Sequence, residues 1–511
     1  MAHNEKTRNQ EDPVPGSTAN RKLVSIRRHN PAKDHFCGIN NLTITWDGPD
    51  DPENPKNWAV RRKWLAVISI SGFVLMSPLP TTIVAPALDV ITVELGITSK
   101  ILESMILSIF LLGYAIGPMF ISPLSEIWGR TLVLQTFNLV FLIFNTACGF
   151  AGSIEQLLVF RFFAGLFGSC TVGIGAGTLG DLFNASERGK AMAIYSIFPL
   201  LGQVLGPIAG GFLTARASWR WAFYATSIID GCVQIFGLFF LDESYMPVLL
   251  RRKRDRLTKA GATGLYTEHD FPTGFSLSMM RETMIRPIKL LTTQPIVQVM
   301  ALYQGYLYGN IYILYASIAV LWTTRYNEPL DIASLHYLAL ALGTAFAAEV
   351  ATHINDRIFR VLTKRNNDEG LPEFRIPIMI PATVVLTVGL FWYGWSAEAR
   401  LFWLMPDIGI ALFAAAAYIC TVSNNIYVVD TYGRYSASAL AATSMLRCLA
   451  GFVFPLFSPY AYERLGYGWT STILGIIALC IGLTGVIFLW KFGHVLRKNS
   501  PYCASRDVDD S

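Results

Sequence analysis

Apolar segments of about twenty residues recur along most of this chain, and short polar loops separate them. A helix of about 20 residues crosses the roughly 30 Å of bilayer hydrocarbon, where only helices and closed barrels satisfy their own backbone polar groups. Of the 511 residues, 52% are hydrophobic and 15% are charged, too few charges to cover a soluble body. The sequence therefore predicts an all-α integral membrane protein with twelve transmembrane helices, near residues 64–86, 101–122, 131–152, 156–180, 189–213, 219–241, 295–322, 332–353, 376–395, 402–427, 436–459 and 468–491.

The placement of basic residues predicts which loops face the cytosol. Lys and Arg gather at residues 61–63 before the first segment, at 251–259 after the sixth, and at 491–498 in the tail. Cytosolic loops carry an excess of these residues, so we expect both termini and the loop 242–294 to be cytosolic. In a membrane protein the 251–259 run indicates contact with lipid headgroups, and no nucleic-acid partner is expected.

The longest polar interruption divides the spans six and six, which suggests a duplicated transporter architecture. The eight cysteines and seven histidines are scattered, so neither a disulfide framework nor a metal site is expected. The expected organisation is a cytosolic N-terminal tail over residues 1–60, disordered to about residue 40; a six-helix bundle over 61–241; a cytosolic loop over 242–294; a second six-helix bundle over 295–491; and a cytosolic tail over 492–511.

Residues 202–211 place four glycines and a proline inside one apolar segment. Small residues let helices approach closely in lipid, and a proline kink is tolerated there. We expect this span to be bent, with Gly206 and Pro207 at a contact between the two halves. The spacing resembles the signature on the fifth span of proton-coupled drug antiporters of the major facilitator superfamily, carried here by Gly202, Gln203, Gly206, Pro207, Gly210 and Gly211.

The loop after the second span reads S-P-L-S-E-I-W-G-R at residues 122–130 and contains Leu124, Glu126, Gly129 and Arg130. It resembles the hallmark loop G-x-L-A-D-x-x-G-R of the same superfamily, with Ser122 in place of the first glycine. The resemblance implies that Glu126 and Arg130 lock cytosolic helix ends in the outward-facing state. The alternative is an ordinary surface salt bridge, and the missing glycine leaves the close approach at Ser122 open. Residues 355–360 repeat an acid before an arginine in the second half.

Arg161 is a cation inside the apolar fourth span. Burying such a group costs about 2.5–3.5 kcal/mol on insertion scales, so we expect Arg161 to have a functional role. With Gly165 it matches the family's R-x-x-x-G motif, which implies a role for Arg161 in proton coupling. Glu103 and Asp230 are the candidate acidic partners, because a carboxylate that alternates between apolar and cationic surroundings can load and release a proton. The alternative is that Arg161 reaches the outer headgroups.

Four polar side chains in the seventh span follow one another at spacings of 4, 4 and 3, which places them on one helix face. Tyrosines on such a face can stack on a planar substrate and hydrogen-bond to it, although helix packing is an equal alternative. The stripe carries no fixed charge, which favours a neutral or weakly ionised planar molecule over a polyamine. The predicted cavity wall consists of Gln304, Tyr308, Tyr312, Tyr315, Asn425 and Arg447.

Further stretches at residues 46–58, 242–253, 427–442 and 454–469 extend the resemblance. Over about residues 45–495 the chain is similar to twelve-span fungal drug:proton antiporters, the group that exports polyamines, azoles, cycloheximide and fungal toxins. The resemblance implies an efflux transporter, not an enzyme, that exports a small amphipathic toxic compound, a fungal toxin, secondary metabolite or drug. It also implies that the proton gradient is the energy source and that no cofactor is needed.

The same resemblance implies a monomer in the plasma membrane, or alternatively the vacuolar membrane, with protons, lipid and a small-molecule substrate as its partners. Three alternatives remain at this point: a polyamine exporter, an uptake symporter for a nutrient or vitamin, and a membrane sensor that does not transport. The sequence does not identify the substrate.

Overall fold

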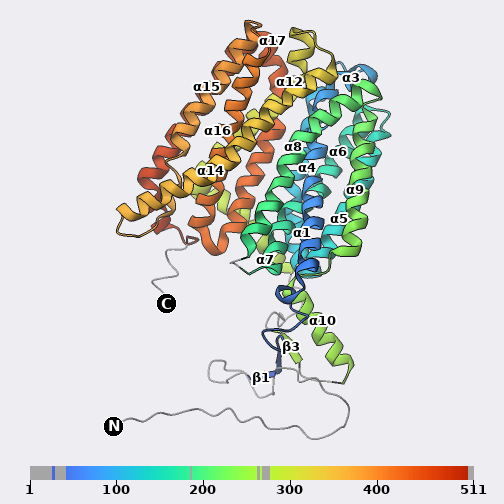
Figure 1. Cartoon of the computed structure of the whole chain (residues 1–511), viewed down its shortest axis with the longest axis vertical. Helices are drawn as coiled ribbons and strands as arrows, with labels where there is room; N and C mark the ends of the chain where they lie inside the picture. Colours follow the sequence, from blue (N-terminus) through green and yellow to red (C-terminus); the bar gives the residue numbers. More distant parts are fainter. Residues whose placement is uncertain (1–25, 29–41, 185–186, 262–264, 268–276, 504–511) are drawn as a thin grey trace.

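The computed structural model in Figure 1 describes residues 26–28, 42–184, 187–261, 265–267 and 277–503. Long helices run side by side in one bundle, and α10 (Met246–Lys259) projects from one end of it. We call this the terminal end, because α1 begins and α17 finishes there, and we call the opposite side the far end.

The first half of the bundle makes six crossings. Pro80 and Pro86 interrupt the first crossing, which is therefore built from short consecutive helices. The elements are α1 (Val60–Leu75), α2 (Leu79–Thr82), η2 (Ala85–Ala87) and α3 (Leu88–Glu94); α4 (Lys100–Trp128); α5 (Arg130–Gly149); α6 (Ile154–Gly168) with α7 (Cys170–Leu182); α8 (Arg188–Arg216); and α9 (Arg220–Phe240).

The second half also makes six crossings. Its last apolar stretch, Leu404–Asn499, is 96 residues long and turns at Gly433 and Gly466, whose φ angles of 43° and 74° suit glycine. With nine other apolar stretches, the three crossings of this stretch make twelve in the described chain. The elements are α12 (Pro295–Arg325); α13 (Leu330–Ala333), η3 (Ser334–His336) and α14 (Tyr337–Arg365); η4 (Pro372–Arg375) and α15 (Met379–Glu398); α16 (Leu404–Tyr432); and η5 (Gly433–Tyr435) with α17 (Ser436–Asn499).

The helices overlap every predicted span but extend beyond most of them. The largest difference is at α14, which continues to Arg365 and not to residue 353. Hydropathy locates the part of a helix that lies in lipid, whereas polar turns continue the same helix outside it. Large apolar side chains such as Phe239, 77% exposed, and Ile143, 59% exposed, remain on the outer surface, where lipid would cover them.

Between the halves lie α10 and α11 (Leu277–Thr293), and a small sheet stands beside α10. Strand β2 (Leu42–Ile44) pairs antiparallel with β1 (Ile26–Arg28) and parallel with β3 (Leu265–Thr267). The predicted disorder up to residue 40 is wrong for Ile26–Arg28, because pairing with β2 satisfies the backbone of this segment. The remainder of that prediction lies outside the described residues.

The segment before the first crossing, which includes η1 (Pro55–Asn57), is held against α10. Lys253 Nζ lies 2.7 Å from Asp47 Oδ1 and 3.4 Å from Asp51 Oδ2. Burial raises the pKa of Asp51, but the N–H groups of Asp47 and Glu53, with Lys253, outweigh it, so the pKa lies below its ordinary value. Two stretches that carried the family resemblance separately, residues 46–58 and 242–253, thus meet around one lysine.

Candidate functional site

The glycines of residues 202–211 pack α8 closely against the interrupted first crossing. A β-carbon at Gly202 would lie 2.7 Å from Pro78 Cγ, and one at Gly206 would lie 3.0 Å from the Leu79 carbonyl oxygen. One at Gly210 would collide with the Ile83 carbonyl group. The expected contact of Gly206 between the two halves is therefore wrong: the short helices after α1, in the same half, occupy that side of α8. Pro207 is buried in the same helix, and Gln203 is half-buried.

Gly211 is the member of this motif that faces the other half. A β-carbon there would collide with Ser334 in η3, so the far ends of the two halves touch at this point. Arg216 Nη2 lies 3.5 Å from Asp331 Oδ2 nearby. A second ion pair between the halves joins Lys100 at the start of α4 to Glu463 of α17. The two halves are thus connected at the far end through α8 and α4.

Arg161 is completely buried, with 1% of its surface exposed. Its Nη1 lies 3.4 Å from the Pro80 carbonyl oxygen and its Nη2 lies 3.5 Å from that of Leu107. The guanidinium also lies 5.5 Å from the ring centre of Phe110 and 5.7 Å from that of Phe223. This burial excludes the alternative in which the side chain reaches the headgroups.

Neither candidate acid pairs with Arg161 among the residues that the structure describes. Asp230 is fully buried between α9 and α5, where it accepts hydrogen bonds of 3.0 and 3.1 Å from the Asn138 amide. Glu103 instead interacts electrostatically with Asp89 of α3. The pairing of Arg161 with an acid, expected from sequence, is therefore absent from this conformation.

The predicted tyrosine stripe forms a continuous row of rings along α12. The centres of Tyr308 and Tyr312 are 5.0 Å apart, those of Tyr312 and Tyr315 are 5.6 Å apart, and Tyr337 of α14 stacks on Tyr315 at 6.0 Å. Arg447 of α17 places its guanidinium 4.8 Å from the centre of the Tyr308 ring. The stripe itself carries no fixed charge, but Arg447, which the sequence analysis also placed in the cavity wall, brings a cation directly beside it.

The row continues toward the terminal end through amides. Gln304 Nε2 donates to Asn425 Oδ1 at 3.3 Å, and Asn424 Nδ2 donates to Gln304 Oε1 at 2.9 Å. The structure thus brings together all six residues of the predicted wall along α12, α16 and α17. Tyr308 also lies at the boundary between the halves, because a β-carbon at Gly451 would meet both Tyr308 and Leu111 of α4.

At the terminal end, Arg130 forms an ion pair that the sequence did not predict. Its Nε lies 2.6 Å from Asp181 Oδ2 on α7, and its guanidinium lies 4.9 Å from the ring centre of Tyr245. The expected partner, Glu126, is exposed and pairs with no cation within ion-pair distance in the described chain. The predicted Glu126–Arg130 lock is therefore wrong in this conformation, because helix packing brings α7, and not the last turn of α4, to the arginine.

Gly129 and Glu243 complete this junction. Glu243 Oε1 accepts from the backbone N–H of Arg130 at 3.1 Å and Oε2 from that of Thr131 at 3.3 Å, which stabilises the start of α5. Gly129 has φ 102°, and a β-carbon there would lie 2.8 Å from the Glu243 carboxyl carbon. Leu124 packs beneath, against the core of the first half.

The missing glycine at Ser122 is compensated on the neighbouring helix. A β-carbon at Gly173 of α7 would collide with the Ser122 hydroxyl, so the close approach of α4 and α7 is preserved. In the second half, Arg375 lies 2.8 Å from Asp356 and 3.5 Å from Asp430, with its guanidinium 4.1 Å from the ring centre of Phe359. The acid of residues 355–360 thus pairs with an arginine outside that stretch.

A buried histidine cluster at the far end also escaped the sequence analysis. His336 Nδ1 lies 2.7 Å from Asp407 Oδ2 and its Nε2 lies 3.0 Å from Glu328 Oε2, while Trp322 stacks on the ring at 4.1 Å. Asp407 lies 71 residues from His336 in the sequence, so no local spacing indicates the complete cluster. The signal available was weak: Glu328 and His336 share the short polar turn between the seventh and eighth crossings.

Comparisons with known proteins agree with this geometry. Residues 70–455 match the Major Facilitator Superfamily. The efflux pump vrtL of Penicillium aethiopicum is 44% identical over 90% of this chain and 91% of its own length, and the MFS transporter cpaT of Aspergillus oryzae is 38% identical over 90% and 93%. The xylose transporter XylE of E. coli, in a partially occluded inward open conformation, superposes with a TM-score of 0.63 at 15% identity, covering 84% of this chain and 98% of its own.

The chain belongs to the major facilitator superfamily and is a membrane transporter. The predicted all-α membrane fold is confirmed. Members of this superfamily bind small molecules and work as single chains, and they are not enzymes.

Proposed function

We propose that this transporter exports small amphipathic aromatic compounds that carry an acidic group, with inward proton flow as the driving force. The observation that carries the proposal is the guanidinium of Arg447, 4.8 Å from the Tyr308 ring centre at the boundary between the halves. Its Nε atom is buried and donates to no described atom. A buried donor of this kind is costly unless a ligand accepts from it.

The surroundings of the tyrosine row favour an anion over a polyamine. Tyr312 lies within electrostatic range of both Arg161 and Arg447, and the Nε of Arg161 is also unpartnered. A polyamine would need carboxylates facing the rings. Asp230 is instead enclosed between α5 and α9. The efflux-pump name of one relative supports export, which we extend to this chain as part of the proposal.

For proton coupling we propose Asp230 as the carrier. A fully buried carboxylate hydrogen-bonded to a neutral amide lacks a counter-charge, and a proton would neutralise it. Asp230→Asn should flatten the pH dependence of transport, with Glu103→Gln as the control that retains it. Unchanged pH dependence in Asp230→Asn, together with its loss in Glu103→Gln, would transfer the role to the Asp89–Glu103 pair.

We further propose that the terminal end faces the cytosol and that the protein resides in the plasma membrane. The basic residues of α10 support this orientation. With exposed Cys232 and Cys480 replaced by serine, an impermeant thiol reagent should leave Ala260→Cys unlabelled in intact cells and should label the exposed far-end variant Val93→Cys. The reverse pattern would overturn the orientation.

The substrate proposal is tested with a planar aromatic carboxylic acid, its methyl ester and spermidine in cells with and without the protein. Cells without it should accumulate more acid, with spermidine unchanged. Arg447→Gln should reduce the preference for acid over ester by roughly tenfold to a hundredfold, the worth of one charge-assisted hydrogen bond. Arg464→Gln, an exposed cation of the same helix, is the control. Retained spermidine with unchanged acid would sink the proposal.

A further inference from the structure

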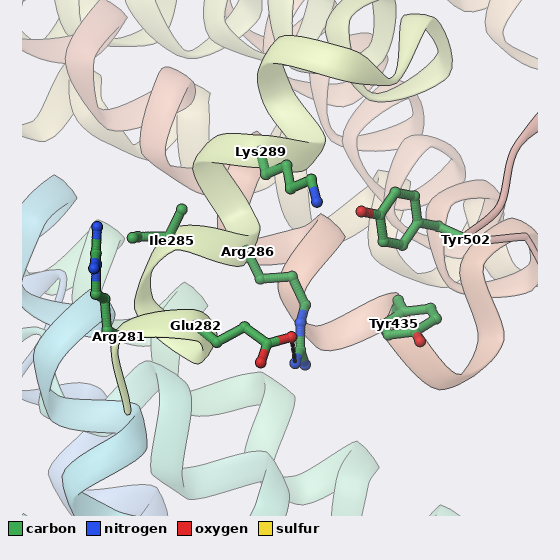
Figure 2. Close-up of a pocket in the computed structure, with 7 residues that line it drawn as sticks. All are labelled: Arg281, Glu282, Ile285, Arg286, Lys289, Tyr435 and Tyr502. Carbon is green, nitrogen blue, oxygen red and sulfur yellow. Dashed lines mark ion pairs between the residues drawn. The ribbon is translucent and has the colours of Figure 1, made fainter. Parts of the chain in front are cut away.

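A pocket lies at the terminal end, away from the tyrosine row. It has a volume of about 380 Å³ and opens between α11 and the segments around η5 and the end of α17, as Figure 2 shows. This size falls in the range of about 300–1,000 Å³ typical of small-molecule sites. Its walls are formed by Arg281, Glu282, Ile285, Arg286, Lys289, Tyr435 and Tyr502.

The pocket carries an excess of positive charge. Three of its seven residues are cations and one is an acid. Glu282 lies 3.6 Å from Arg286 and its side chain is 75% exposed, so it neutralises the pocket weakly. Glu126 of α4 also interacts electrostatically with Arg286. Arg281 and Lys289 form no ion pair with any residue that the structure describes, which leaves their charges available.

Two tyrosines form the opposite wall. The rings of Tyr435 and Tyr502 meet edge to face at 5.4 Å, and the guanidinium of Arg286 lies 5.6 Å from the ring centre of Tyr435. In Figure 2 the Lys289 amine and the Tyr502 hydroxyl face each other across the pocket. The pocket as a whole therefore offers cations and hydroxyl donors, which are the groups that donate hydrogen bonds to phosphate oxygens.

The helix that carries the cations lies where lipid headgroups are expected. Residue Gln294 alone separates α11 from the membrane-crossing α12. Leu290 is buried against the bundle, whereas Ile285 and Ile288, 43% and 39% exposed, stand among the cations. Exposed apolar residues beside basic ones are typical of a helix that rests at the membrane interface.

We infer that this pocket binds the headgroup of a multiply phosphorylated phospholipid of the phosphoinositide class. A single phosphodiester would engage only part of the cationic set, whereas a headgroup with phosphomonoesters can reach Arg281, Arg286 and Lys289. Because α11 contacts α4 in the first half and α12 and α17 in the second, the bound lipid braces both halves at the terminal end. The site requires only the membrane location of the protein and is independent of the exported substrate.

The test uses the full-length protein in phosphatidylcholine nanodiscs doped with either phosphatidylinositol bisphosphate or phosphatidylserine. The bisphosphate should raise the Tm of the native protein. The double variant Arg281→Gln, Lys289→Gln should weaken the apparent affinity by roughly fivefold per cation removed. Arg252→Gln, an exposed cation of α10 at the same end of the molecule, should leave it unchanged.

Lys289→Gln alone is a second variant, because this exposed side chain does not contribute to packing. An equal Tm shift in the native protein and the double variant would overturn the site. Equal shifts with phosphatidylserine, matched for charge, would overturn the headgroup class. Soluble inositol trisphosphate, added to phosphatidylcholine nanodiscs, should bind far more weakly than the lipid; equal binding would identify a free phosphate ester, and not a lipid, as the ligand.

Discussion

The two halves of the bundle use the same kind of ion pair at the terminal end but bury it to different depths. In the first half, Arg130 begins α5 and pairs with Asp181 near the end of α7; their side chains are 16% and 22% exposed. In the second half, Arg375 precedes α15 and pairs with Asp430 near the end of α16 and with Asp356, which are 35% and 55% exposed. The third and fourth crossings of each half are thus joined at equivalent positions.

The supporting acids differ as well. Glu243 binds the backbone at the start of α5 and lies against Gly129. Its counterpart Glu373 lies 3.1 Å from Arg497 at the end of α17. Both halves therefore carry charged residues at equivalent positions of this junction, but the packing around those residues differs. The first half, with the deeper pair and a glycine in a left-handed conformation, should tolerate less change at this junction.

The largest expected effect is that of Gly129→Ala. The residue has φ 102°, and the added carbon would lie 2.8 Å from the Glu243 carboxyl carbon, so we expect a loss of about 2–5 kcal/mol from backbone strain and overpacking. Folded protein, measured by size-exclusion chromatography and Tm, should fall sharply. Gly231→Ala, where nothing lies within 4 Å, is the control. Similar Tm values for the two variants would contradict the prediction that the first half tolerates less change at this junction.

A second contrast compares glycines in the two halves. A β-carbon at Gly206 would collide with the Thr82 hydroxyl, whereas one at Gly305 of α12 would lie no closer than 3.4 Å to any atom. Gly206→Ala should cost about 1–3 kcal/mol and slow transport, while Gly305→Ala should be close to neutral. Transport rate per folded molecule and Tm measure both effects. A costly Gly305→Ala would show that this position of α12 is packed as closely as Gly206 of α8.

The ion pairs themselves should differ by a smaller amount. Arg130→Gln leaves Asp181 largely buried without its cation, for which we expect about 1–3 kcal/mol, less than the 3–5 of a fully buried pair. Arg375→Gln leaves more exposed acids and should cost about 0–1 kcal/mol. The Tm of each single variant is compared with that of the double variant that also carries Asp181→Asn or Asp430→Asn. This comparison separates the energy of the ion pair from the other effects of each substitution. Equal costs in the two halves would contradict the difference in burial.

The smallest effect concerns the segment that precedes the first half. The pKa of Asp51 in the folded protein lies below its ordinary value. The stability that its carboxylate gives to this segment is therefore present above about pH 4, and it is lost as the pH falls through the pKa of the folded state. Asp51→Asn should remove this dependence and expose residues 46–58 to protease at neutral pH. The protection of residues 46–58 from protease, followed from pH 7 to pH 3, measures this pH dependence, with Asp50→Asn as the control. Identical profiles would show that Lys253 holds the segment without Asp51.

Much of the molecule could be predicted from local sequence. The twelve crossings follow from segment length and hydropathy, because each helix satisfies its backbone internally and its lipid exposure depends on its own side chains. The row from Gln304 to Tyr315 was also predictable, because helical spacing places these residues on one face wherever the helix packs. The family motifs located the correct junctions, although they did not identify the contacts made there.

The sequence by itself determined which segments enter the membrane and which of them carry unusual residues, such as Arg161 and the glycines of α8. Only the tertiary structure decided the partners: Asp181 for Arg130 in place of Glu126, and Thr82 beside Gly206 in place of the other half. The physical reason is that hydropathy and helical period are properties of one segment, whereas an ion pair or a close helix contact depends on how two segments distant in sequence are packed together.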